Sequence, residues 1–336
     1  MLFALHLFLT IQIYYGQKTI TLNLWIKMKK MKVAVTIRSF NKKNLCTDAF
    51  LKRCDVSFFN ETGHRLDDNE LIRALHGAEA VIAGTERFGK NVFSASPDLR
   101  IISRVGVGID NIDLDAAKKN NIVVLFTPEA PVQAVAEHTI ALMLSVLKHI
   151  PLYNSNVRAG DFTLTSGSLL SGKVVGIVGM GRIGKKVAEI LIGFGCGIIY
   201  YDPFVHSLPE PWEKLDHLED LIRRADILSL HSPPQADGSP IITSDLLSQC
   251  RRGTIIINTS RGSVIDERAL MRGLDSGIIS GAGLDVFSVE PYTGPLLKYQ
   301  QVIATPHVSS NTTETREKME NDAIGNLLAE IEGTKK

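Results

Sequence analysis

Residues 174–202 read VVGIVGMGRIGKKVAEILIGFGCGIIYYD. The stretch contains four parts in order: an apolar run, a GxGxxG turn, an amphipathic helical pattern, and a second apolar run that ends on an acid. A dinucleotide site needs this order, with the turn between a strand and a helix and the acid about 20 residues on. The stretch therefore predicts a doubly wound domain that binds a dinucleotide. The alternative, an ordinary glycine-rich turn, explains the glycines but not the acid.

Each glycine of this turn has an expected role. Gly179 permits the tight turn, Gly181 lets a pyrophosphate approach the backbone, and Gly184 lets the helix pack closely on the strand. The phosphate charge then meets the free N–H groups at the start of the helix, which includes Arg182 and Ile183. We assign all five residues to cofactor binding.

Asp202 ends the second apolar run and predicts which dinucleotide is bound. A carboxylate at this position accepts hydrogen bonds from the adenosine ribose hydroxyls and repels a 2′-phosphate. The next residues are Pro203 and Phe204, so no arginine directly follows the acid to pair with such a phosphate. NAD is therefore favoured over NADP. The alternative is a turn aspartate that only precedes Pro203.

Composition bounds the remaining possibilities. The 336 residues are enough for about two domains, and 44% of them are hydrophobic. A formal net charge of +1 gives no support for nucleic-acid binding. The four cysteines are scattered without a CxxC pair, which argues against a zinc site or a disulfide framework. We expect no metal, no membrane partner and a cytoplasmic location, where thiols stay reduced.

Short β-rich runs alternate with helical stretches from Met31 onward, which predicts βαβ units and parallel sheets. We expect a substrate domain over 31–129 and 308–333, and an NAD-binding domain over 130–307 inserted into it. The predicted fold is α/β, with a Rossmann domain inserted into a flavodoxin-like domain. The expected strands are 32–36, 55–59, 80–83, 101–105 and 122–125, then 174–178, 198–201, 227–230, 254–258, 281–284 and 302–304. Long helices are expected over 130–147 and 312–332.

The first thirty residues differ from the rest. An apolar run over 2–15 precedes a lysine cluster, whereas a signal peptide carries its charge before its apolar core. We expect residues 1–30 to be a non-native or disordered extension, with Met31 or Met28 as the physiological start. The alternative is a single membrane anchor, although the run is short for a membrane helix.

Three further motifs each follow an apolar run, where loops gather at one edge of a parallel sheet. They are IIINTSRG (255–262), GAGLDVFSVEP (281–291) and VIATPH (302–307). Singly, Arg261, Glu290 and His307 could be a loop ion pair, a solvated turn residue and a structural histidine. Together they fit hydride transfer, since a histidine moves the proton, a carboxylate orients it and an arginine binds the substrate carboxylate.

With these motifs the sequence resembles the D-isomer-specific 2-hydroxyacid dehydrogenase family, and within it the D-3-phosphoglycerate dehydrogenase-like branch. The resemblance implies Arg261, Glu290 and His307 as the catalytic residues, with Arg261 also binding substrate. SRVGVGIDNIDLDAA (103–117) is similar to the family's substrate loop, which implies that backbone N–H groups around Val105, Gly106 and Val107 bind the carboxylate. Three more residues are implied to line the cofactor: Asp285 near the carboxamide, His231 in LHSPP, and Ser260.

The resemblance leaves the substrate open. The arginine that meets a phosphate in phosphoglycerate dehydrogenases is absent near Ala83–Glu86, where Arg87 or Arg104 could replace it. The leading interpretation is an NAD-dependent D-2-hydroxyacid dehydrogenase that acts on a small 2-hydroxy or 2-keto acid such as 3-phosphoglycerate. The alternatives are a glyoxylate or hydroxypyruvate reductase and a non-catalytic, NAD-sensing corepressor-like protein. The family also implies a homodimer.

Overall fold

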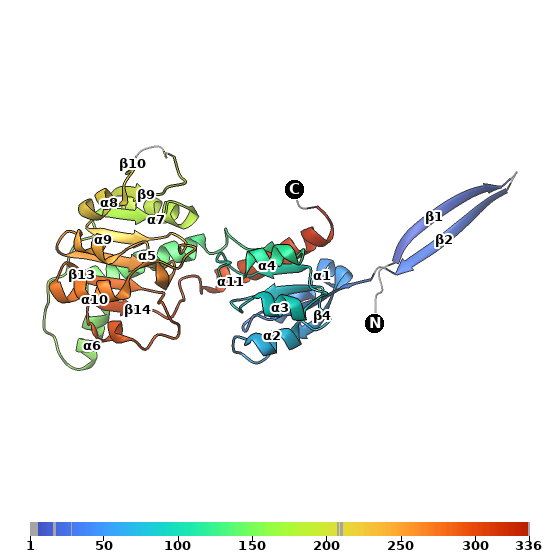
Figure 1. Cartoon of the computed structure of the whole chain (residues 1–336), viewed down its shortest axis with the longest axis horizontal. Helices are drawn as coiled ribbons and strands as arrows, with labels where there is room; N and C mark the ends of the chain where they lie inside the picture. Colours follow the sequence, from blue (N-terminus) through green and yellow to red (C-terminus); the bar gives the residue numbers. More distant parts are fainter. Residues whose placement is uncertain (1–5, 16–17, 28, 207, 209–210, 335–336) are drawn as a thin grey trace. The chain divides into compact units, whose positions relative to one another are not determined.

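The computed structural model describes residues 6–15, 18–27, 29–206, 208 and 211–334. The chain divides into two compact units. Unit 1 comprises Met1–Pro131 and Thr313–Lys336, and unit 2 comprises Val132–Thr312 (Figure 1).

Unit 2 contains a parallel seven-stranded sheet in the order β10-β9-β8-β11-β12-β13-β14. This is the Rossmann order, and its direction reverses between β8 and β11, where ligands of such sheets bind. The strands are β8 (Val174–Val178), β9 (Gly197–Tyr201), β10 (Trp212–Lys214), β11 (Ile227–Leu230), β12 (Thr254–Asn258), β13 (Ile279–Leu284) and β14 (Val302–Ala304).

Helices cover both faces of this sheet because its strands are apolar on both sides, as parallel strands are. One buried cluster joins α5 (Val132–Leu147) and α7 (Arg182–Gly193) to the sheet. The other joins α8 (Leu218–Arg224), α9 (Ser244–Ser248) and α10 (Glu267–Ser276). The remaining helices are α6 (Ile150–Arg158) and the short 3-10 helices η2 (Gly262–Val264) and η3 (Pro295–Lys298).

Unit 1 has a parallel five-stranded sheet in the flavodoxin-like order β4-β3-β5-β6-β7. The strands are β3 (Met31–Val35), β4 (Cys54–Phe59), β5 (Ala80–Ala83), β6 (Ile101–Arg104) and β7 (Val123–Leu125). Helices α2 (Asp68–Ala74), α3 (Lys90–Ala95) and α4 (Leu114–Lys119) cover one face. The other face carries η1 (Lys42–Cys46), α1 (Asp48–Arg53) and α11 (Thr313–Ile331).

The C-terminal helix α11 completes unit 1, although it follows unit 2 in the sequence. Met319, Ala323, Ile324 and Leu327 of α11 are buried in the same cluster as Val33 and Val35 of β3. The buried Ser103 hydroxyl on β6 also donates a 2.7 Å hydrogen bond to the carbonyl of Ala323. The expected fold class, two doubly wound parallel-sheet domains, is confirmed.

Three segments differ from the sequence expectations. Strands β1 (His6–Tyr15) and β2 (Lys18–Lys27), which lie within the expected extension over 1–30, pair antiparallel. In β2 the apolar residues Ile20, Leu22, Leu24 and Ile26 alternate with other residues, which is the period of a strand. The sequence also did not predict α6 or β10, because both are short and weakly patterned. None of the described helices is both long and apolar enough to cross a membrane.

Two glycines of α7 should respond oppositely to substitution. A Cβ at Gly184 would lie 2.2 Å from the carbonyl oxygen of Gly179, whereas one at Gly193 meets nothing within 4 Å. We expect Gly184→Ala to lower the free energy of unfolding by about 1–3 kcal/mol, as overpacking does. Gly193→Ala is the matched control and should be neutral or stabilising, since alanine favours helices. Urea unfolding measures both, and equal stabilities would contradict the close packing.

Candidate active site

The glycine turn of unit 2 lies at the point where the sheet order reverses. Gly179 has φ +94°, and a Cβ there would lie 2.8 Å from the backbone of His231 and Ser232, which follow β11. A Cβ at Gly181 would meet nothing within 4 Å, so the backbone there is open to a ligand. Gly181 is the N-cap of α7 and makes no side-chain capping bond. The first N–H groups of a helix lack intrahelical partners, so this turn can receive a phosphate.

The Asp202 carboxylate holds the glycine turn in place. Its Oδ2 accepts a 2.8 Å hydrogen bond from the Met180 N–H, and its Oδ1 accepts bonds from the N–H groups of Phe204 and Val205. The residue therefore does act as a turn aspartate, and it also joins the end of β9 to the phosphate turn. Each carboxylate oxygen can accept about two hydrogen bonds, so Oδ2 retains capacity for a ribose hydroxyl.

His231 stands beside the turn as a neutral residue. Burial lowers the pKa of His231 to about 4, and Ser229 lies 2.8 Å from its Nε2. Its backbone N–H donates to the carbonyl of Val178, which extends the pairing of β8 with β11. A neutral imidazole here adds no charge next to the expected dinucleotide.

The loop after β12 is ordered by the buried Asn258. Its Oδ1 accepts bonds from the backbone N–H and hydroxyl of Ser260, and its Nδ2 donates to the carbonyl of Arg261. A Cβ at Gly262 would lie 1.8 Å from the carbonyl carbon of Phe287, so only glycine fits there. The NTSRG loop is therefore packed directly on the backbone of the DVFSVEP loop.

This packing brings the three expected catalytic residues together. His307 Nδ1 lies 2.9 Å from Glu290 Oε2, and Glu290 Oε1 accepts a 3.1 Å bond from the Phe287 N–H. Partial burial of Glu290 disfavours its charged form. Other interactions outweigh burial and lower the pKa of Glu290. They are the hydrogen bond and charge of His307, the hydrogen bond from the Phe287 N–H, and the charge of Arg261. Glu290 is thus held as a carboxylate against the imidazole, whose Nε2 has no hydrogen-bond partner among the described residues.

Asp285, which the resemblance implied to lie near the cofactor carboxamide, is held within a network of hydrogen bonds. Its side chain is 0% exposed. Its Oδ1 accepts bonds from the Thr305 hydroxyl at 2.6 Å and the Val308 N–H, and its Oδ2 accepts one from the Ser309 N–H. The carboxylate therefore fixes the loop that carries His307. His307 itself adopts a left-handed backbone conformation with φ 54°.

Sequence reasoning missed two residues that extend this arrangement. His138 on α5 lies 3.1 Å from the Thr305 hydroxyl and 3.6 Å from Asp285 Oδ1. Thr139, the next residue, lies 3.0 Å from the Thr259 hydroxyl in the NTSRG loop. Both side chains lie in α5, whose sequence is mostly apolar and indicates a packing role. The adjacent polar residues His138 and Thr139 within this apolar helix could have indicated a further role.

The predicted substrate loop belongs to unit 1, and two of its three expected N–H donors already have partners. The N–H of Val105 donates to the carbonyl of Ala83, and the N–H of Gly106 donates to the Thr127 hydroxyl at 2.7 Å. These two donors are already used, which corrects the expectation that they bind a carboxylate. Val107 is 37% exposed and remains a candidate. The Arg104 guanidinium packs on Gly106, where a Cβ would lie 1.3 Å from its Nη1.

Comparison with known proteins identifies the family. Residues 140–309 match the model described as D-isomer specific 2-hydroxyacid dehydrogenase, NAD binding domain. Hydroxypyruvate reductase of Thermotoga maritima is 35% identical over 277 residues, which cover 80% of this chain and 90% of that protein. The chain belongs to the D-isomer specific 2-hydroxyacid dehydrogenase family.

Two further members show how the family varies. D-3-phosphoglycerate dehydrogenase of Mycobacterium tuberculosis is 34% identical over 273 residues, which cover 80% of this chain. This chain spans about half the length of that relative, since the match covers 52% of it. A solved D-lactate dehydrogenase from Aquifex aeolicus, complexed with NAD and lactic acid, has a TM-score of 0.77 and 26% identity. That match covers 90% of this chain and 96% of the solved one.

The lowered pKa of Glu290 predicts a pH-dependent contribution to stability. A carboxyl whose pKa is lower in the folded state stabilises the fold above its ordinary pKa of 4.5. That contribution disappears as the pH falls through the lowered value. We expect Glu290→Gln to reduce thermal stability most at neutral pH and least in acid. Calorimetric melting of both proteins from neutral to acidic pH measures this, and a difference independent of pH would contradict it.

Proposed function

We propose that this chain is an NAD-dependent D-2-hydroxyacid dehydrogenase. The contact between His307 and Glu290, with the Arg261 charge acting on the same carboxylate, is the observation that carries the proposal. These residues lie in the same unit as the open glycine turn. Bound NAD(H) would supply or accept the hydride at the substrate carbon. Gly179, Gly181, Arg182, Ile183, Gly184 and Asp202 would hold it, with His231 and Ser260 nearby.

The chain's own residues account for the proton and for substrate binding. In the reducing direction, His307 Nε2 would donate a proton to the carbonyl oxygen, and in the oxidising direction it would accept the hydroxyl proton. Glu290 would keep the ring oriented through Nδ1 and stabilise the imidazolium. Arg261 would bind the substrate carboxylate, since guanidinium and carboxylate match in shape and charge.

The substrate class is a small 2-hydroxy or 2-keto acid. Within it we propose 3-phosphoglycerate, because the sequence is similar to the D-3-phosphoglycerate dehydrogenase named above. The hydroxypyruvate reductase supports hydroxypyruvate or glyoxylate as the second candidate. A non-catalytic NAD sensor is the third candidate, and it would be excluded by turnover of any 2-keto or 2-hydroxy acid. We also propose a cytoplasmic location, because the four cysteines are all free thiols.

The proton-transfer role is tested by His307→Ala. We expect turnover to fall by ~10²–10⁴-fold, the usual contribution of general acid–base catalysis, while NAD affinity stays nearly unchanged. A cofactor-absorbance assay over a panel of 2-keto acids, phosphohydroxypyruvate included, measures turnover and identifies the substrate. Weaker NAD binding with unchanged turnover would contradict the role. Turnover of no 2-keto or 2-hydroxy acid by the wild-type protein would contradict the enzyme proposal.

We further propose that the protein is a homodimer that uses the segment from α6 to residue 169. Ile150, Val157, Phe162, Leu164 and Leu169 are between 52% and 91% exposed and close together in sequence, which is unusual for a solvated surface. Phe162→Ser with Leu164→Ser should give a monomer in light scattering after gel filtration. Leu297→Ser, which alters a 51% exposed apolar side chain elsewhere in unit 2, is the control. An unchanged mass would contradict the assignment of this surface.

A further inference from the structure

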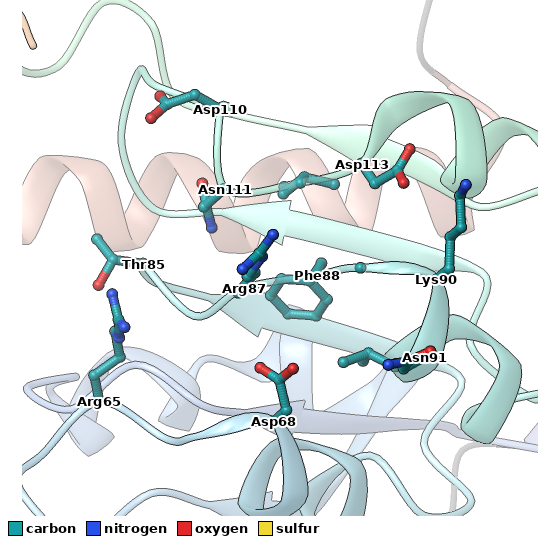
Figure 2. A pocket seen from close by; sticks show the side chains of 13 residues that line it. Arg65, Asp68, Thr85, Arg87, Phe88, Lys90, Asn91, Asp110, Asn111 and Asp113 are labelled. Atoms are coloured by element: carbon teal, nitrogen blue, oxygen red, sulfur yellow. The ribbon is translucent and has the colours of Figure 1, made fainter. Parts of the chain in front are cut away.

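The hollow of about 700 Å³ in unit 1 is lined in part by the predicted substrate loop (Figure 2). Asn111 and Asp113 of that loop border it together with Arg87, which could replace the missing phosphate-binding arginine. This hollow is therefore part of the expected substrate region. The polar contacts of α5 in unit 2 have no such assignment, and they reach both loops that carry the expected proton-transfer and carboxylate-binding residues.

Helix α5 lies directly on strand β13. A Cβ at Gly283 would lie 2.9 Å from the Cβ of Leu142, and a Cβ at Gly281 would lie 2.7 Å from Cγ1 of Val146. His138 precedes these two α5 residues at intervals of four residues, so the three share one face of the helix. Because close-packed interiors are barely compressible, α5 keeps a fixed distance from the loops at the end of that strand.

His138 donates a hydrogen bond to the loop of His307. The Thr305 hydroxyl donates its one hydrogen to Asp285 Oδ1, at 2.6 Å. The Thr305 oxygen can therefore only accept a hydrogen bond from His138 Nε2, which lies 3.1 Å away. Thr305 precedes His307 by two residues, so this bond fixes the start of the segment that carries the imidazole.

Thr139 accepts a hydrogen bond from the loop of Arg261. The Thr139 hydroxyl donates to the Val135 carbonyl at 2.7 Å, so its oxygen accepts from the Thr259 hydroxyl at 3.0 Å. Thr139 and Thr259 are 0% and 7% exposed, so little water is available to replace either partner. Thr259 precedes Arg261 by two residues, which is the same spacing as on the other loop.

We propose that His138 and Thr139 are positioning residues for the reaction. Because they are adjacent on one closely packed helix, they set the spacing between the imidazole of His307 and the guanidinium of Arg261. His138 acts on the loop that transfers the proton, and Thr139 acts on the loop that binds the substrate carboxylate. A displacement of about 1 Å can lower a rate by ~10²-fold, so such alignment affects catalysis from outside the reacting groups. This inference deepens the proposed function and rests on it.

The test is the steady-state kinetics of two shape-conserving variants. His138→Phe keeps a ring but removes the donor, and we expect the turnover number to fall at least about tenfold with KM for the 2-keto acid nearly unchanged. Thr139→Val keeps the branched shape but removes the acceptor, and we expect KM to rise about tenfold with the turnover number nearly unchanged. Loss of a contact made only in the transition state lowers the turnover number, whereas loss of uniform binding raises KM.

Conservative replacements and a control separate positioning from general damage to the helix. His138→Gln and Thr139→Ser retain a donor and a hydroxyl, so each should restore most of the loss. Glu137→Gln alters an exposed α5 side chain whose described partner is Gln133, and both kinetic constants should stay at their wild-type values. Parallel changes of turnover number and KM in both variants, no change in either, or an equal loss in the control would overturn the proposal.

Nuclear magnetic resonance of the protein with isotope-labelled histidine tests the same roles without turnover. It follows the His307 imidazole, whose signal is identified by its loss in His307→Gln. We expect this signal to shift in His138→Phe and to stay in place in Thr139→Val. Equal shifts in the two variants, or none in His138→Phe, would overturn the positioning roles. Failure of the wild-type protein to turn over any 2-keto or 2-hydroxy acid would instead contradict the proposed function.

Discussion

The candidate active site depends on one buried carboxylate. Asp285 directly follows β13 and receives hydrogen bonds from the Thr305 hydroxyl and from the N–H groups of Val308 and Ser309. A buried carboxylate is costly unless several donors satisfy it, so the loop from Thr305 to Ser309 must adopt the one conformation that supplies them. His307 lies in the middle of that loop, and its backbone N–H donates to the Asp285 carbonyl.

Two backbone contacts then align the remaining groups. Gly262 packs on the Phe287 backbone, which places the loop of Arg261 against the loop of Glu290. Gly179 packs on the backbone of His231, and Asp202 holds the turn from the other side. Because loops at the carboxyl edge of a parallel sheet are fixed in this way, residues far apart in sequence form one constellation. His138 and Thr139 tie α5 to two of these loops.

Most of this fold and part of the candidate site could be predicted from the sequence. Alternating apolar runs predicted every strand of the two parallel sheets except β10, and motif positions predicted Arg261, Glu290 and His307 as candidate catalytic residues. The sequence could not indicate that the N–H groups of Val105 and Gly106 are already used, since hydrogen-bond partners such as Thr127 depend on tertiary contacts. For the same reason, the burial of Asp285 and the contacts of His138 appear only in the structure. The pairing of β1 with β2 was obscured by the overall apolar character of both strands.

We propose that Asp285 positions the loop of His307 and does not bind the cofactor. The most direct measurement is the dissociation constant of NAD together with the turnover number at saturating NAD for Asp285→Asn. Asparagine has nearly the same shape but replaces one acceptor oxygen with a donor that faces the loop. We expect an almost unchanged dissociation constant and a turnover number at least about tenfold lower, since a buried donor loses its acceptor. A large loss of NAD affinity with unchanged turnover would contradict it.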